Sequence, residues 1–113
     1  QRHAIGQRYN QLLDQFEIAR IHQKPERTSV FAQYTVVVPN RHAMQKNLEE
    51  AGIPTAVHYP VPLNEQPAYE RFCCPDCTPV AKKMAKCVLS LPMSPDIVGS
   101  DLLRIVHALK LEV

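Results

Sequence analysis

Histidine and tyrosine stand side by side at the end of a short apolar run, in the stretch GIPTAVHYPVPLNEQPAY that covers residues 52–69. The imidazole of His58 and the phenol of Tyr59 can both donate and accept hydrogen bonds. Pro60 and Pro62 follow at once and restrict the backbone around them. A loop this stiff is typical of a segment that holds side chains in a fixed place. Ligand contact is one interpretation of the pair, and a structural histidine satisfied by backbone groups is the other.

Four cysteines raise the question of metal or redox chemistry: Cys73, Cys74, Cys77 and Cys87. The segment CCPDC contains one C-x-x-C pair, but a tetrahedral zinc site needs a second half of comparable spacing. Only Cys87 and distant histidines such as His107 could supply it. Because the N-terminal residues do not resemble a secretory signal, free thiols in a surface loop are the favoured interpretation. A redox pair, or an independent binding or zinc-stabilised module built on Cys73–Cys87, stays open as an alternative.

Helices and strands are expected to alternate along the first half of the chain. Apolar residues recur at helical spacing over residues 1–16, and a run rich in β-branched and aromatic residues over 29–38 predicts a strand. Residues 41–51 again show helical spacing, with Asn40 as the cap and Gly52 in the left-handed position after the helix end. The side chains expected on the inner faces of these two helices are Ile5, Tyr9, Leu12, Leu13, Phe16, Met44, Leu48 and Ala51.

The second half continues the alternation. A short strand is expected over residues 54–59, before a proline-rich loop. Thr78-Pro79 is a plausible cap with proline at the first helical position, opening a helix through 80–87. Residues 88–92 predict another strand, and Ser100-Asp101 introduces a last helix. The side chains expected on the inner face of that helix are Leu102, Leu103, Val106 and Leu109.

These elements predict an α+β fold with a small, three-stranded, mainly antiparallel sheet and helices packed on one face. A length of 113 residues suits a single domain over residues 1–113. The second face of the sheet would stay bare, which is normal in a domain that docks on another.

Composition excludes several classes of function. The net charge is +2, from 13 basic and 11 acidic residues, and does not build the positive field that nucleic-acid or membrane-surface binding needs. No apolar run approaches the length of a membrane span. The chain begins at once with helical periodicity and without a methionine, so we expect a piece of a longer protein.

Four segments then stand in a characteristic order: RYNQLL, SVFAQYTVVVPNR, LEEAGIPTAVHYPVPLNEQPAY and VLSLPMSP. From Arg8 to about Leu109, this order resembles the C-terminal part of the DegT-type sugar aminotransferases. The most specific part is GI-x-T-x-VHYP-x-PL with Gln66. Many family members carry histidine after PL, where this chain has Asn64. In that respect PLN-x-QPA is more similar to the subgroup that acts on UDP-linked 2-acetamido-3-keto uronic acids in surface polysaccharide synthesis.

The resemblance implies the C-terminal small domain of a fold type I enzyme that uses pyridoxal 5'-phosphate to aminate nucleotide-linked keto-sugars. In this family the lysine that forms the Schiff base, and the residues that bind the cofactor phosphate, lie upstream of where this chain begins. The lysines present are Lys24, Lys46, Lys82, Lys83, Lys86 and Lys110. Each occurs in a polar segment or on an amphipathic helix, whereas a Schiff-base lysine needs desolvation or a cationic neighbour. We therefore expect no catalytic residue here, no activity of the fragment alone and no firm cofactor binding by it.

The resemblance also implies which residues touch the substrate. In the matching enzymes the histidine and tyrosine of the HYP run contact the nucleotide-sugar, which points to His58 and Tyr59. Neighbours on a regular strand point to opposite faces, but Pro60 ends regular pairing and lets the strand tip turn. Asn64 and Gln66 are further candidates that could donate to sugar or phosphate oxygens, and turn capping is their other interpretation.

The partners implied are the nucleotide-sugar, a large N-terminal domain and a second copy of the enzyme in a cytoplasmic homodimer. Nucleic acid, membrane and metal are not expected. Lys82 and Lys86, one turn apart in KKMAK, are interpreted as a solvated helix face.

Overall fold

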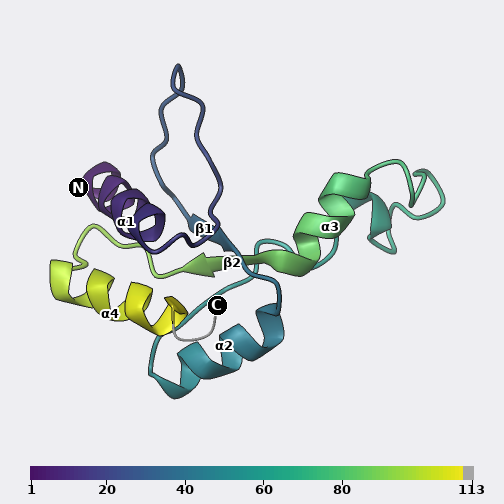
Figure 1. Cartoon of the computed structure of the whole chain (residues 1–113). Coiled ribbons are helices and arrows are strands. Elements are labelled where there is room, and N and C mark those ends of the chain that lie inside the picture. The colour runs from purple at the N-terminus through teal and green to yellow at the C-terminus, as the bar shows by residue number, and fades with distance from the viewer. Residues whose placement is uncertain (111–113) are drawn as a thin grey trace.

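The structure is a computed structural model that describes residues 1–110. Its elements, in chain order, are α1 (Arg2–Gln15), β1 (Tyr34–Val37), α2 (Arg41–Glu50), the 3-10 helix η1 (Leu63–Glu65), α3 (Pro79–Cys87), β2 (Val88–Leu91) and α4 (Gly99–Lys110). Helices around one antiparallel strand pair confirm the α+β class (Figure 1). Within this part of the chain, every helix is too short or too polar to cross a bilayer.

The sheet of the described residues consists of β1 and β2, which run antiparallel. The facing pairs are Tyr34–Leu91, Thr35–Ser90, Val36–Leu89 and Val37–Val88. The strand expected over residues 29–38 is regular only over Tyr34–Val37. Phe31 has a φ of +47° and donates its backbone N–H to the hydroxyl of Ser29, so the chain cannot be extended there.

The third strand expected over residues 54–59 is wrong. Only Ala56 pairs, through two backbone hydrogen bonds with Ser90 of β2 at 2.8 and 3.1 Å. Pro54 and Pro60 flank this bridge, and a proline nitrogen has no hydrogen to give to a ladder. The segment therefore touches the sheet at a single point and then leaves it.

The two faces of the sheet differ in character, because side chains alternate along each strand and facing pairs share a face. One face carries the strand residues that belong to the hydrophobic core: Tyr34, Val36, Leu89 and Leu91. The helix residues of the same core come from α1, α2 and α4: Tyr9, Leu12, Leu13, Met44, Leu48, Leu102, Ile105, Val106 and Leu109. The other face carries the facing hydroxyls of Thr35 and Ser90, 3.2 Å apart.

Two residues expected on inner helix faces are exposed instead. Ala51 lies one residue beyond α2, where the helical stripe no longer applies. Leu103 is 40 % exposed, because it follows Leu102 and points about 100° away from the buried stripe of α4. The remaining predicted inner positions are buried or half-buried.

The sequence predicts four helix boundaries, and two of them have the expected chemistry. Ser100 and Asp101 lie within the first turn of α4 and do not precede it, because this helix begins at Gly99. The side chain of Asn40 accepts a hydrogen bond from the backbone of Ala43, and Gly52 has a φ of +72°. Thr78 precedes α3 and Pro79 opens it, but the Thr78 hydroxyl donates to Asn64 rather than capping the helix.

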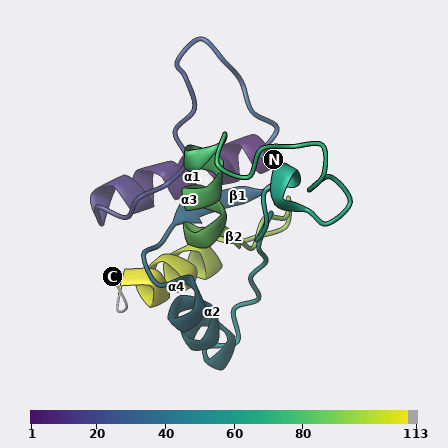
Figure 2. The same ribbon diagram turned by 90° about the vertical axis from the view of Figure 1, so that its right-hand side faces the viewer.

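Two segments leave the body formed by the sheet, α1, α2 and α4. The chain between α1 and β1 extends as a long loop, and residues 60–87, called the arm below, carry η1 and α3 away on another side (Figure 1). Figure 2 shows α2 and α4 side by side on one side of the strands. The stretch around His58 is therefore one of the two connections between the body and the arm, and the other is the step from α3 into β2.

Gly6 tests the packing of α1. A Cβ at this buried position would lie 2.5 Å from the ring of Phe31, so the whole ring would have to move. We expect Gly6→Ala to destabilise the fold by about 1–2 kcal/mol, since overpacking outweighs the roughly 1 kcal/mol that alanine gains in a helix. Denaturant unfolding measures the change. Gly99→Ala is the matched control, because nothing lies within 4 Å of its Cβ position, and equal effects at both sites would contradict the packing described here.

Candidate functional site

His58 lies on the polar face of the sheet and is half-buried. Its Nδ1 is 2.9 Å from the hydroxyl oxygen of Ser90, which is only 5 % exposed. The backbone bridge between Ala56 and Ser90 holds the chain against β2 two residues before the ring. The histidine is thus held by a side chain of the sheet. The structural interpretation expected a hydrogen bond to a backbone group instead.

Tyr59 follows across a cis peptide bond and is 69 % exposed. Its ring meets the ring of His58 edge to face, with centroids 5.4 Å apart and planes at 83°. Both side chains line one shallow pocket of about 250 Å³, whose other walls come from the proline loop, α3 and Val88. The structure therefore brings the two rings together at an open surface, and neither is sealed in the core.

A second shallow pocket, of about 270 Å³, lies against His58 as well. It is lined by the end of β2, by Gln33 before β1, and by Pro54 and Thr55. His58 and Ser90 both contribute to its wall. His58 accordingly lines both pockets, of which the first lies toward the arm and the second toward the body.

Asn64 and Gln66 are not brought to this pair. The side-chain amide of Asn64 donates to the carbonyl of Cys74 at 2.9 Å, and its oxygen accepts from the hydroxyl of Thr78 at 3.0 Å. Gln66 donates to the carbonyl of Val61 at 3.3 Å. Both amides are half-buried and tie the loops of the arm together, as the turn-capping interpretation proposes.

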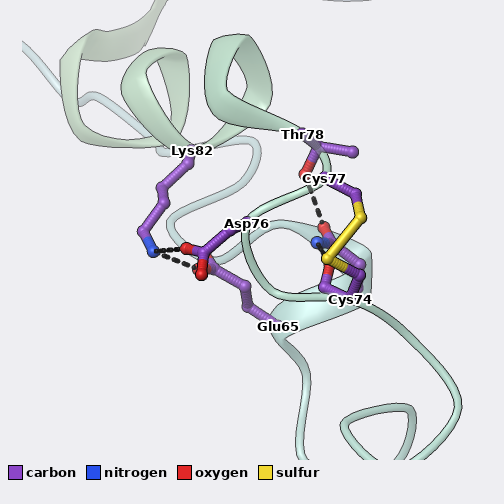
Figure 3. A network of polar contacts seen from close by, with 7 residues as sticks. Glu65, Cys74, Asp76, Cys77, Thr78 and Lys82 are labelled. Carbon is purple, nitrogen blue, oxygen red and sulfur yellow. Dashed lines mark hydrogen bonds and ion pairs between the residues drawn. A yellow bond between two sulfur atoms is a disulfide. The ribbon is translucent and has the colours of Figure 1, made fainter.

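Cys74 and Cys77 form a disulfide, with Cα atoms 5.4 Å apart, so the expectation of free thiols is wrong for these two (Figure 3). Cys73 and Cys87 are unpaired. Among residues 1–110, the structure holds no cluster of three or more histidine, cysteine or acidic side chains suited to a metal ion. The zinc-stabilised module therefore has no support in the described part of the chain.

Lys82, on α3, forms two ion pairs within the arm. Its Nζ lies 3.1 Å from Glu65 in η1 and 3.4 Å from Asp76 inside the C-x-x-C loop (Figure 3). The hydrogen bond to Glu65 is the largest cause that raises the pKa of Lys82, and the charges of both carboxylates act in the same direction. With 43 % of its side chain exposed, Lys82 still lies on a solvated face, as does the exposed Lys86, but the sequence analysis did not predict its ion pairs.

The lysines do not fit the role of a Schiff-base residue. Lys82 is the least exposed of them, and its raised pKa favours the protonated amine, which is not a nucleophile. The others are exposed, and Lys46 also pairs with Glu50 at 3.9 Å. None of these lysines is buried, as a desolvated Schiff-base amine would be.

The arrangement can bind and orient a polar ligand through His58 and Tyr59. The sequence analysis missed two residues behind the histidine, Ser90 and Thr35. The signal was present, because Ser90 is the one polar residue in VLSL and Thr35 interrupts the apolar positions of YTVV. Only the pairing register shows that they face each other.

Breaking the disulfide should loosen the arm alone. The chain-entropy relation for a loop this short gives about 2 kcal/mol, or roughly thirty-fold faster opening of the tied segments. We expect Cys74→Ser with Cys77→Ser to speed hydrogen exchange in residues 63–78 by up to that factor and to leave α1 and the sheet unchanged. Cys73→Ser is the matched control. Exchange that is unchanged in the arm, or faster in the core, would contradict the ties described above.

Comparison with known proteins identifies the family of this chain. Residues 1–110 match the DegT/DnrJ/EryC1/StrS aminotransferase family. The chain is 44% identical over 94 residues to the UDP-2-acetamido-2-deoxy-3-oxo-D-glucuronate aminotransferase of Pseudomonas aeruginosa, covering 83% of this chain and 26% of that protein. It is 34% identical over 87 residues to the dTDP-3-amino-3,4,6-trideoxy-alpha-D-glucose transaminase of Streptomyces venezuelae, covering 76% and 23%.

Solved structures agree with the sequence matches. DesV of S. venezuelae, in complex with a ketimine intermediate, superposes with a TM-score of 0.89 at 31% identity over 97% of this chain and 30% of its own. A DegT DnrJ EryC1 StrS aminotransferase from Brucella abortus gives a TM-score of 0.87 at 30% identity, over 96% of this chain and 29% of its own. The chain thus spans about a quarter to a third of the length of these relatives. It belongs to the DegT/DnrJ/EryC1/StrS aminotransferase family.

Proposed function

We propose that residues 1–113 are the C-terminal domain of a longer aminotransferase that uses pyridoxal 5'-phosphate to aminate a nucleotide-linked keto-sugar. Family membership and the share of each relative that the chain covers support this assignment. The proposed substrate is a UDP-linked keto uronic acid, on the strength of the 44% identity to an aminotransferase named for such a compound. The proposed setting is surface polysaccharide synthesis in the cytoplasm.

The observation that carries the proposal is the joint placement of His58 and Tyr59 on one open pocket. A nucleotide-sugar presents hydroxyl, carboxylate and phosphate oxygens, and an imidazole and a phenol are directional partners for such groups. Nδ1 of His58 is occupied by Ser90, while Nε2 has no partner among residues 1–110. One ring nitrogen is thus anchored and the other is available to a ligand.

The domain would act through orientation and not through proton transfer. It would close one side of the substrate cleft, hold the sugar in place and limit the access of water to the reacting carbon. The cofactor, when bound, supplies the carrier for the amino group. We assign its lysine and its phosphate site to a large domain outside this chain, because the lysines described above do not fit. On this account the chain alone does not transaminate, and the complete enzyme works as a homodimer.

Asn64 and Gln66 take a different place in this proposal. Because their amides bind Cys74, Thr78 and Val61, they would shape the arm, and a direct contact with substrate would require them to give up these bonds. We keep them as proposed substrate-side residues of the complete enzyme, secondary to the His58–Tyr59 pair.

In the complete enzyme, His58→Ala should raise the KM for the nucleotide-sugar about 10- to 100-fold, as expected for the loss of a hydrogen bond to a charged group. The visible absorbance of the bound cofactor should stay unchanged. Steady-state kinetics and the absorbance spectrum measure the two effects. His42→Ala, an exposed position on α2, is the matched control. Kinetics of the His58 variant that equal the control would rule out its substrate role.

A further inference from the structure

We propose that Ser90 is a positioning residue for substrate binding, whose hydroxyl, backed by Thr35, orients the imidazole of His58 so that Nε2–H faces the ligand. This inference rests on the proposed function, because it assumes that His58 touches the nucleotide-sugar. It assigns a task to Ser90 and Thr35, to which the proposed function gives none.

Three segments meet at Ser90. Its backbone exchanges two hydrogen bonds with Ala56, and its hydroxyl lies 2.9 Å from Nδ1 of His58 and 3.2 Å from the hydroxyl of Thr35. Thr35 is its direct cross-strand partner in the β1–β2 register. Ser90 therefore fixes both the main chain leading to His58 and the ring itself.

A hydroxyl at this position is not needed for the strand. Val88, Leu89 and Leu91 are buried around it, and a buried polar group is unfavourable there unless it finds hydrogen-bond partners. Apolar side chains in place of both the Ser90 and the Thr35 hydroxyl would serve the sheet equally well, because replacing both partners of a hydrogen bond is nearly neutral. The hydroxyl pair makes a difference only to the group it faces, which is His58.

Proton counting allows two hydrogen-bond chains through Thr35, Ser90 and His58, because either hydroxyl can donate to the other and the ring can take either tautomer. Ser90 has one hydroxyl proton, so it can donate either to Nδ1 of His58 or to Thr35, but not to both. When Thr35 donates to Ser90 and Ser90 donates to Nδ1, the neutral imidazole carries its proton on Nε2. Nε2–H is then a donor toward the phosphate, carboxylate or hydroxyl oxygens of a nucleotide-sugar. The reverse chain would leave a lone pair on Nε2, which does not suit an anionic ligand.

The first experiment measures which ring nitrogen of His58 carries the proton. In the 113-residue chain with 15N-labelled histidine, NMR at a pH where the imidazole is neutral should show His58 mainly as the Nε2–H form. His58→Gln assigns its signals among the five histidines. Ser90→Ala should move the signals toward a mixture of the two forms, Ser90→Thr should restore them, and Ser100→Ala on the exposed start of α4 should change nothing.

The second experiment measures the steady-state kinetics of the complete enzyme with the nucleotide-sugar. Ser90→Ala should raise the KM for the nucleotide-sugar about three- to ten-fold with a smaller change in kcat, since an orienting contact is lost and the ligand contact is only weakened. Ser90→Cys, which keeps the side-chain shape but has only a weak S–H donor, should act in the same direction and provides the test if Ser90→Ala does not fold. Adding Ser90→Ala to His58→Ala should have no further effect on KM.

The outcomes distinguish the positioning role of Ser90 from the ligand role of His58. Unchanged His58 signals and an unchanged KM in a folded Ser90→Ala or Ser90→Cys variant would overturn the positioning role. A further loss on top of His58→Ala would also overturn it, because Ser90 would then act by another route. If the ring responds to Ser90→Ala but the KM responds to neither Ser90→Ala nor His58→Ala, the contact stands and the proposed ligand role of His58 fails.

Discussion

The antiparallel pairing of β1 with β2 is the constraint on which the rest of this structure depends. Its register puts Tyr34 and Val36 on the face that α1, α2 and α4 cover, and therefore turns Thr35 and Ser90 to the other face. A shift by one residue would exchange the two sets and leave the helices without a core. The hydrophobic face thus determines where the hydroxyls stand. The position of His58 follows, because its chain is bridged to Ser90.

A second level of order lies in the arm. The disulfide Cys74–Cys77, the amide of Asn64 and the ion pairs of Lys82 join η1, the C-x-x-C loop and the start of α3 (Figure 3). The ion pairs are partly or mostly exposed, so each adds little to global stability. Their combined effect is local: they hold one wall of the pocket on which Tyr59 lies. The body and the arm therefore contribute differently to the same site. Ser90 of the sheet holds His58, and the arm forms walls of the pocket beside Tyr59.

The sequence predicted the helices well, because their apolar spacing and caps are local signals. The family resemblance pointed to His58 and Tyr59, and Pro60 predicted the turn that lets both rings reach one pocket, where the structure places them. The sequence analysis failed for the third strand, since proline on both sides of Ala56 removes donors that a propensity scale does not count. It also missed Ser90, the disulfide and the ion pairs of Lys82. These depend on which distant segments meet, and a single sequence carries no direct record of that.

The central claim is that an anchored imidazole and an exposed phenol present a nucleotide-sugar to the reacting group held elsewhere in the protein. The most direct measurement is a crystal structure of the complete enzyme with the nucleotide-sugar bound. The account predicts Nε2 of His58 and the hydroxyl of Tyr59 about 3 Å from oxygens of the ligand, with Nδ1 still on Ser90. A ligand bound well away from both rings, with the pocket covered by another part of the protein, would contradict it.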